Sequence, residues 1–355
     1  MRKGTYYPVH STFHDNHRGL SVGKHSASTL KRVAPKRQTA KAKKNSLLMP
    51  AIVVILGLLV MMYPVVSTAW NNYGSSKAAQ EYAKLEKSVP QEVKDKKWED
   101  AHKYNERRTT GPILDPWLNR IHPDNPEYGY YLDQLDKNEA MARLIFPAID
   151  ADLPIYHGTS DETLQRGLGH LYGSDLPVGG SGTHSVITGH TGLSNATMFD
   201  NLNKAQKGDV FYVQVSGHKL KYEVDQIKVV RPDETDDLHA VDGSDYITLI
   251  TCTPYGINSH RLLVRGHQVP MAESEDTVFD QNHASNWQWW MYALVAVALT
   301  IAVAFAWWLW RQWKATRGND NKAGTASKAE AGTTAGEEPS RKPNEGETPS
   351  SHTGR

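Results

Sequence analysis

The stretch Tyr246–Ile247–Thr248–Leu249–Ile250–Thr251–Cys252 is an uncharged run that ends in the only cysteine of the 355-residue chain. It predicts a buried strand with a thiol at its exit. A second apolar run, Arg261–Leu262–Leu263–Val264–Arg265, follows after a short loop. If the two strands pair as antiparallel neighbours, Cys252 and Arg261 project from one face with their side-chain roots about 5 Å apart.

A thiol beside a guanidinium is a candidate nucleophile next to a group that can stabilise an anion. Each residue also has a purely structural interpretation. Cys252 could be an inert, buried thiol that packs as a small hydrophobic side chain. Arg261 could form an ordinary salt bridge at the rim of the sheet. The strand pattern alone leaves both interpretations open.

The region around these strands has a β pattern from about Met141 onward. Short apolar runs alternate with turn signals at residues 142–149, 184–188, 210–215, 219–230, 246–253 and 261–269. This spacing predicts an antiparallel sandwich or a closed barrel of about 130 residues. Residues 160–170 and 195–205 could hold single helical turns.

Two long apolar segments lie outside the β region. Residues 47–69 and 289–310 contain no charge, and each is long enough to cross a bilayer as a helix. Tryptophans bracket the second segment, as at a membrane interface. The first segment could instead be a cleaved signal peptide, since Ser67-Thr68-Ala69 resembles a cleavage site.

The distribution of charge predicts the orientation of these segments. Residues 1–46 carry a net charge of +10, residues 311–355 carry +2, and the region between the spans carries −11. Positive flanks remain in the cytoplasm, so both termini are expected inside and residues 70–286 outside the cell. An acidic outer region argues against nucleic acid as a partner.

These observations divide the chain into eight expected parts. They are a basic cytoplasmic tail (1–46), a transmembrane helix (47–69), a helical stalk interrupted at Pro90 (70–108), a turn-rich lid or loop segment (109–131), a β-barrel domain (132–272), a polar linker (273–288), a second transmembrane helix (289–310) and a disordered cytoplasmic tail (311–355).

A thiol nucleophile normally needs a group that transfers protons. His190 lies in Thr188-Gly189-His190-Thr191-Gly192, directly after an apolar run. A histidine between glycines at a strand exit is exposed and can meet the end of another strand. His157, His170 and His184 are expected to be ordinary surface or hydrogen-bonded histidines. No paired spacing such as C-x-x-C frames Cys252, which argues against a metal site.

Together these motifs resemble a sortase, and within that family the class C, pilin-polymerising type. The stretch Thr248-Leu249-Ile250-Thr251-Cys252 with Arg261 is similar to the family's TLxTC signature and its downstream arginine. Thr188-Gly189-His190 is similar to the segment that carries the family's catalytic histidine. Leu176–Gly180, Lys207-Gly208-Asp209 and Pro254–Val264 are also similar to class C members. The resemblance covers about residues 75–310, and an apolar anchor at each end agrees with it.

The resemblance implies an all-β, closed sortase-type barrel and a membrane-anchored cysteine transpeptidase of Gram-positive bacteria. Cys252 would attack the Thr–Gly bond of an LPxTG-like sorting signal and form a thioacyl intermediate. His190 would act as general acid and base, and Arg261 would hold the substrate and the oxyanion. A lysine amine of another pilin subunit would then resolve the intermediate. The implied enzyme needs no metal and no organic cofactor.

The turn-rich segment acquires a role through the same resemblance. Asp115-Pro116-Trp117 is similar to the lid motif of class C sortases, which would place Asp115 near Arg261 and Trp117 over Cys252. An ordinary Asp-Pro turn with a packed tryptophan is the structural alternative. Two other functions remain open, a housekeeping sortase that attaches proteins to cell-wall peptide and a non-catalytic, membrane-tethered adhesion or assembly module.

Overall fold

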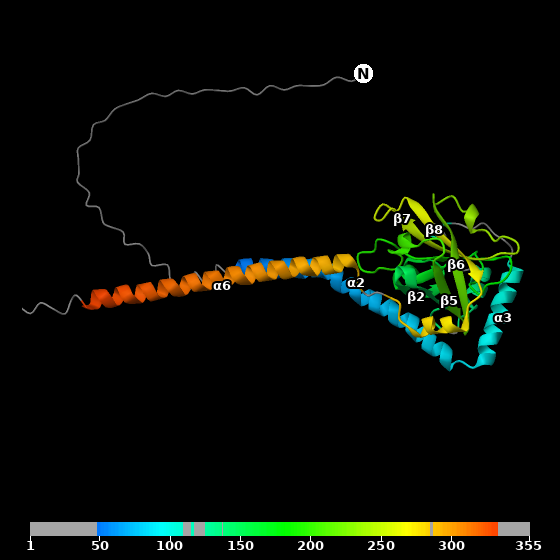
Figure 1. Cartoon of the computed structure of the whole chain (residues 1–355), viewed down its shortest axis with the longest axis horizontal. Helices are drawn as coiled ribbons and strands as arrows, with labels where there is room; N and C mark the ends of the chain where they lie inside the picture. The colour runs from blue at the N-terminus through cyan, green and yellow to red at the C-terminus, as the bar shows by residue number, and fades with distance from the viewer. Residues whose placement is uncertain (1–47, 109–114, 117–124, 137, 285–286, 333–355) are drawn as a thin grey trace, which may run out of the picture. The chain divides into compact units, whose positions relative to one another are not determined.

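The structure is a computed structural model that describes residues 48–108, 115–116, 125–136, 138–284 and 287–332, with side chains up to residue 315. Eight strands form a closed barrel, of which five are labelled in Figure 1. Their order around the barrel is β1-β2-β3-β4-β7-β8-β6-β5. The strands are β1 (Ala142–Phe146), β2 (Ala151–His157), β3 (Leu168–His170), β4 (Thr183–Thr188), β5 (Val210–Val215), β6 (His218–Val230), β7 (Asp245–Thr253) and β8 (His260–Val269).

The predicted closed barrel is confirmed, but the sequence pattern missed two of its strands. The runs that predicted strands correspond to β1, β4, β5, β6, β7 and β8, whereas β2 and β3 were not recognised. Of the two expected architectures, the antiparallel sandwich is not the one observed: β2 pairs with β3 and β4 pairs with β7 in parallel. β4 and β7 are far apart in sequence, so no hairpin signal reveals their pairing.

The barrel interior is filled by one large apolar cluster. It includes Leu144, Phe146, Ile187, Leu249 and Val264, which are each fully or almost fully buried. Alternate residues of the same strands point outward, and Val186, Ile250 and Leu263 form a second, smaller cluster on that outer face. Residues of even number in β4 and β7, and of odd number in β8, therefore share the outer face of this part of the barrel.

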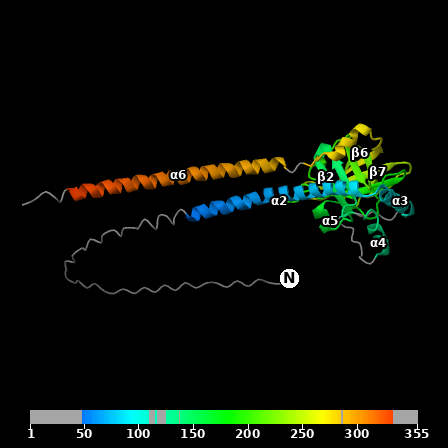
Figure 2. The ribbon, with the colours of Figure 1, turned by 90° about the horizontal axis from the view of Figure 1, so that it is seen from below.

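Short helices cover the barrel at several points (Figure 2). They are α4 (Pro126–Leu132), α5 (Asp161–Arg166) and the 3-10 turns η1 (Pro147–Ile149), η2 (Leu202–Lys204), η3 (Asp236–Leu238) and η4 (Glu273–Asp280). α5 and η2 lie within the two regions for which single helical turns were predicted. The side chain of Ser160 caps α5 by accepting a hydrogen bond from the Thr163 amide at 3.2 Å.

Two longer helices precede the barrel. α2 (Leu48–Ser88) contains the first apolar segment and continues as the start of the stalk, and α3 (Gln91–Arg107) follows. The helices end and begin on either side of Pro90, where the sequence predicts an interruption. Side chains of α2 donate hydrogen bonds to the barrel domain. The Thr68 hydroxyl donates to the Ser194 carbonyl, and the Tyr82 hydroxyl donates to the Met141 carbonyl.

The last helix, α6 (Trp289–Gly332), extends beyond the second apolar segment. By length and composition, α2 and α6 each contain a stretch able to cross a membrane. The expectation of a disordered tail from residue 311 is corrected for residues 311–332, which continue the helix. Ala, Lys and Arg make up ten of these 22 residues, and a helix that is already formed extends at little cost through such residues.

Candidate active site

Three strands bring the candidate residues into one row. In the antiparallel β7–β8 pair, Cys252 lies directly opposite Arg261. In the parallel β4–β7 pair, Thr188 lies beside Ile250. His190 follows Thr188 by two residues, just beyond the end of β4, the strand that neighbours β7. The three candidates therefore come from neighbouring chain segments, in the order β4, β7, β8.

Hydrogen bonds extend the β4–β7 pairing up to His190. The Gly189 amide donates to the Ile250 carbonyl at 3.0 Å, and the Thr251 hydroxyl donates to the Gly189 carbonyl at 2.8 Å. Gly189 is required by close packing, because a Cβ here would lie 2.6 Å from Leu168 and 2.7 Å from Phe199. The residue before His190 is thus held firmly against β7.

The side chains of Cys252 and Arg261 belong to the outer face of the barrel. Cys252 follows Ile250 by two residues, and Arg261 precedes Leu263 by two, so both share the face of the smaller apolar cluster. Cys252 is 8% exposed and Arg261 is 9% exposed, whereas His190 is half-buried. The thiol is a free cysteine. This shared face allows a nucleophile and a cation to act on one bond.

The segment before the barrel covers this row at Asp115. The Nε of Arg261 donates to Oδ2 of Asp115 at 2.7 Å, and the Asp115 side chain is 1% exposed. The next residue is also fixed, since the Thr159 hydroxyl donates to the Pro116 carbonyl at 2.8 Å. The predicted contact between Asp115 and Arg261 is therefore present. Trp117, the second residue of the predicted lid, lies outside the described residues.

The structure also anchors the chain on both sides of the Asp115 segment. Upstream, the Arg108 guanidinium binds the Asp175 carboxylate at 2.8 Å and also donates to the Gly173 carbonyl. Downstream, Tyr131 of α4 is buried against His170, with 2.9 Å between its hydroxyl and Nδ1. Asp115 and Pro116, which together are called the strap below, are thus flanked by two anchored positions, and Asp115 binds Arg261 through a buried ion pair.

Burial and charge determine the protonation of the row. Burial raises the pKa of the Cys252 thiol, while the Arg261 charge lowers it and the Asp115 charge raises it again. Burial lowers the pKa of His190, against a smaller opposing effect of Asp161. Between the two pKa values, the predominant pair is therefore a neutral thiol and a neutral imidazole. The thiolate–imidazolium pair is a minor species in this closed arrangement.

The other histidines that the sequence set aside form hydrogen bonds away from the row. His170 and His184 are fully buried, and the Nε2 of His184 lies 2.7 Å from the Thr248 hydroxyl. His157 contacts the Gln134 carbonyl at 2.6 Å. Within the described part of the chain, no group of three or more His, Cys, Asp or Glu side chains is arranged to hold a metal ion.

Sequence reasoning did not find the residues that hold the loop after His190. Oδ1 of Asp200 accepts hydrogen bonds from the Thr191 hydroxyl at 3.0 Å and from the Gly192 amide at 2.7 Å. The Phe199 amide donates to the His190 carbonyl at 3.0 Å. One acidic residue in a polar loop carries no pattern that distinguishes it from its neighbours, so no sequence signal indicated this role.

Comparison with known proteins agrees with this geometry. Residues 144–269 match the model of the Sortase domain. The chain is 28% identical over 135 residues to Sortase A of Bacillus anthracis and 28% identical over 137 residues to Sortase D of Bacillus subtilis strain 168. Each match covers 38% of this chain, and the matches cover 62% and 66% of the two relatives, which is less than two thirds of either.

Solved structures give longer matches. Sortase C-1 of Actinomyces oris is 59% identical with a TM-score of 0.50, and the match covers 51% of this chain and 99% of that one. Sortase A of Corynebacterium diphtheriae is 47% identical with a TM-score of 0.52, covering 61% and 97%. Sortase C of Streptococcus pneumoniae is 40% identical with a TM-score of 0.51, covering 55% and 97%. The chain belongs to the sortase family and groups with its class C members.

Proposed function

We propose that this protein is a cysteine transpeptidase that links pilin subunits covalently. The observation that carries the proposal is Cys252 opposite Arg261 in the β7–β8 pair, with Asp115 bound to the arginine and His190 just beyond the end of the neighbouring β4. The family membership and the similarity to sortase C structures support the same chemistry. The substrate is an LPxTG-like sorting signal of a partner protein.

In the first half of the reaction, the Cys252 thiolate attacks the carbonyl carbon of the Thr–Gly bond. Arg261 donates to the developing oxyanion. His190 in its protonated form gives its proton to the leaving glycine amine, so the C–N bond breaks and the C-terminal fragment departs. The products are a thioester on Cys252 and a neutral His190.

In the second half, a lysine amine of another subunit attacks the thioester carbonyl. The C–S bond breaks, an isopeptide C–N bond forms, and His190 accepts a proton from the attacking nitrogen. The thiolate and the imidazolium are thereby restored, and no other reactant is consumed. Because His190 gives a proton in the first half and regains one in the second, one histidine can serve both half-reactions.

Asp115 controls when the first step begins. Burial is the main cause that raises the pKa of Cys252, and the Asp115 carboxylate, which binds Arg261, raises it further, so the covered enzyme holds a protonated thiol. Removal of the strap from Arg261 frees the guanidinium for the substrate and favours the thiolate. The lid role of Trp117 belongs to the same proposal and rests on the Asp115-Pro116-Trp117 motif.

A peptide assay tests the transpeptidase proposal. The full-length protein is incubated with an LPxTG peptide and hydroxylamine, and wild type is compared with Cys252→Ala and with Asp115→Ala. We expect a hydroxamate product from wild type, more from Asp115→Ala and none from Cys252→Ala. Absence of product from both cysteine-containing proteins would instead favour a non-catalytic assembly module.

A second assay separates pilus polymerisation from attachment to cell-wall peptide. Purified pilin carrying the sorting signal is supplied with and without its acceptor lysine. High-mass ladders that disappear with the lysine support polymerisation. Ladders that persist without the lysine, or a product formed only with cell-wall peptide, contradict it.

We also propose that α2 and α6 cross the cell membrane with both termini inside and the barrel outside. The apolar stretches in both helices and the basic residues beyond them support this orientation. An impermeant protease added to intact protoplasts should degrade the barrel domain and spare tags at both termini. Protection of the barrel domain would contradict the orientation.

A further inference from the structure

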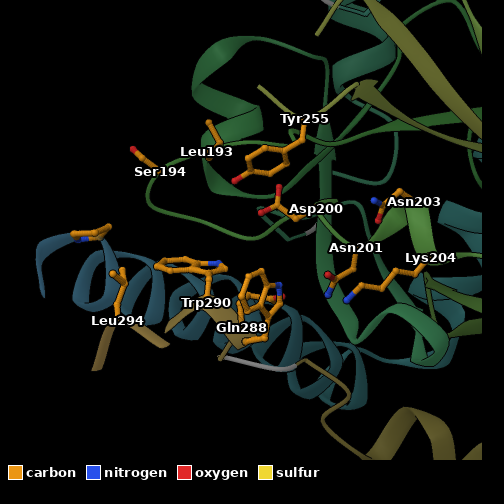
Figure 3. A pocket seen from close by; sticks show the side chains of 12 residues that line it. Leu193, Ser194, Asp200, Asn201, Asn203, Lys204, Tyr255, Gln288, Trp290 and Leu294 are labelled. Atoms are coloured by element: carbon orange, nitrogen blue, oxygen red, sulfur yellow. The ribbon is translucent and has the colours of Figure 1, made fainter. Parts of the chain in front are cut away.

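A cavity of about 600 Å³ lies beside the loop that follows His190. Figure 3 displays its lining, with Asp200 and Tyr255 on the barrel side and Trp290 and Leu294 across the hollow. Its lining residues are Pro64, Leu193, Ser194, Asp200, Asn201, Asn203, Lys204, Tyr255, Gln288, Trp289, Trp290 and Leu294. The cavity therefore combines a mostly apolar, aromatic wall with a polar one.

Asp200 connects this cavity to the row of candidate catalytic residues. Its Oδ1 holds Thr191 and Gly192, the two residues directly after His190. Among the described residues, none donates a hydrogen bond to Oδ2. One oxygen of the half-buried carboxylate thus accepts hydrogen bonds from the loop, and the other lies at the cavity wall.

The second loop of the site also borders the cavity. Tyr255 belongs to the β7–β8 loop that begins just after Cys252, and a Cβ on Gly192 would lie 3.9 Å from its ring and 3.6 Å from the Gly256 amide. The loops that follow His190 and Cys252 therefore touch at this place. A ligand in the cavity would lie against both of them.

The cavity geometry is fixed from the other side by α2. Nδ2 of Asn72 donates to the Thr197 hydroxyl at 2.7 Å, and the Thr197 amide donates back to Asn72 at 2.9 Å. Nδ2 of Asn71 donates to the Asn195 carbonyl at 2.8 Å. The loop between His190 and Asp200 is thus held in place, and the carboxylate has a defined position before any ligand arrives.

We propose that this cavity receives the lysine side chain that resolves the thioacyl intermediate, with its ammonium group bound to Oδ2 of Asp200. The inference rests on the proposed transpeptidase function and specifies where the second substrate binds. A lysine side chain is an apolar stem with a compact cation at its end. The stem fits the aromatic wall, where Tyr255 and Trp290 can also attract the cation, and the carboxylate pairs with the ammonium.

The position suits the transfer of the amine to the thioester. Consecutive Cα atoms are about 3.8 Å apart, so Gly192 lies at most about 7.6 Å from His190 along the chain. The cavity wall that Asp200 and Tyr255 form is thus continuous with the loops that follow His190 and Cys252. The ammonium first loses one proton to solvent water, and the neutral amine then attacks and gives a second proton to His190.

The test compares two nucleophiles on the full-length protein in detergent micelles, with Asp115→Ala present in every variant. The acyl donor is an LPxTG peptide, and the nucleophiles are Nα-acetyl-lysine amide, a cation, and hydroxylamine, which is neutral at pH 7. The readout is the ratio of the second-order rates of product formation with the two nucleophiles. This ratio isolates the cationic site from the acylation step, which both reactions share.

Asp200→Asn is the informative variant, because an amide oxygen can still accept the bonds from Thr191 and Gly192 while the charge is lost. We expect the lysine-to-hydroxylamine ratio to fall about tenfold to a hundredfold, as for loss of a charged hydrogen-bond partner. Asp209→Asn is the matched control, since Asp209 accepts a loop amide from Gln206 at 2.7 Å but does not line the cavity. Its ratio should equal that of the parent protein.

Asn203→Lys gives a second test that leaves Asp200 intact. Asn203 is exposed and lines the cavity, so an added cation should lower the same ratio by repelling the lysine. An unchanged ratio in both Asp200→Asn and Asn203→Lys overturns the inference and leaves the proposed function standing. This is also the outcome expected if the cavity binds a lipid headgroup instead. Failure of the parent protein to react with either nucleophile refutes the transpeptidase proposal itself.

Discussion

Replacing Asp115 by asparagine should make Cys252 more reactive without moving it. In the closed structure, Asp115 binds Arg261 at 2.7 Å and raises the pKa of the thiol through its charge. The variant removes that charge, while an amide oxygen can still accept from Nε of Arg261. The full positive charge of Arg261 then acts on Cys252, its direct neighbour across the β7–β8 pair.

The size of the effect follows from this geometry. An opposite charge within about 4–6 Å lowers a pKa by about 1 to 3 units, and opposed side-chain roots are about 5 Å apart. We take the lower end, about one unit, because other parts of the Arg261 guanidinium remain bound to the carbonyls of Asn258 and His260. The thiolate fraction then rises about tenfold. A thiolate of lower pKa is also a weaker nucleophile, and a Brønsted slope of about 0.5 lowers its reactivity about threefold for one pKa unit. The two effects together make alkylation about threefold faster at neutral pH.

The assay is the rate of alkylation by iodoacetamide at several pH values, read by mass spectrometry. Asp225→Asn is the matched control, because Asp225 forms a similar pair with Arg265 on the same strand, at 2.8 Å, four residues beyond Arg261. The alkylation curve of Asp115→Asn should shift to lower pH, while that of Asp225→Asn should not.

A third variant separates electrostatics from simple uncovering of the thiol. In Asp115→Asn with Arg261→Gln, the gain should disappear if it arises from the arginine charge. A gain that survives loss of Arg261 would refute this reasoning and indicate that the strap acts only as a steric cover. A melting temperature close to that of wild type excludes unfolding as the source of faster alkylation.

Three further predictions concern the pH dependence and stability of the site. The pKa of Cys252 is raised and that of His190 is lowered. In a pH profile, kcat/KM should therefore fall on the acid side only below the usual histidine pKa range, and on the alkaline side only above the usual cysteine pKa range. A fall of kcat/KM inside either range would contradict the neutral resting pair. Gly189→Ala should destabilise the protein by about 1–3 kcal/mol through overpacking, measured by urea unfolding, and an unchanged midpoint would show that the contact is not tight. Arg143→Met should lower the free energy of unfolding by about 3–5 kcal/mol, because it leaves the fully buried Asp152 carboxylate without its partner at 2.6 Å. The double variant Arg143→Met with Asp152→Leu should recover part of this stability in thermal unfolding. No recovery would speak against the buried pair as the cause of the loss.

The part of the site that the sequence predicted is the part encoded locally. Cys252 and Arg261 lie on consecutive strands joined by a short loop, so their opposition follows from antiparallel pairing and is observed in the register. The strand pattern also predicted six strands of the barrel. Local apolar runs and turn residues carry this information, because they act over a few residues.

The parts that the sequence did not predict depend on pairing between distant segments. His190 was a candidate from its place between glycines, but the parallel pairing of β4 with β7 that precedes it has no periodicity in either strand to reveal it. β2 escaped recognition because it is buried and begins just after a short turn at β1, and the three-residue β3 is too short to show a period. Asp200 was missed for the same reason, since its role appears only where two loops meet.

The geometry and the charge of the site are controlled by different parts of the molecule. Strand register fixes the positions of His190, Cys252 and Arg261, and a slip of one residue in β7 would turn Cys252 into the apolar interior. Asp115, in contrast, acts on the same row through one ion pair from a segment outside the barrel. Changes in the strands should therefore alter stability and activity together, whereas changes in the strap should alter thiol reactivity alone. Under the proposed function, such a division would keep the thiol protonated in the covered enzyme and let substrate binding make it reactive, without any rearrangement of the strands that hold it.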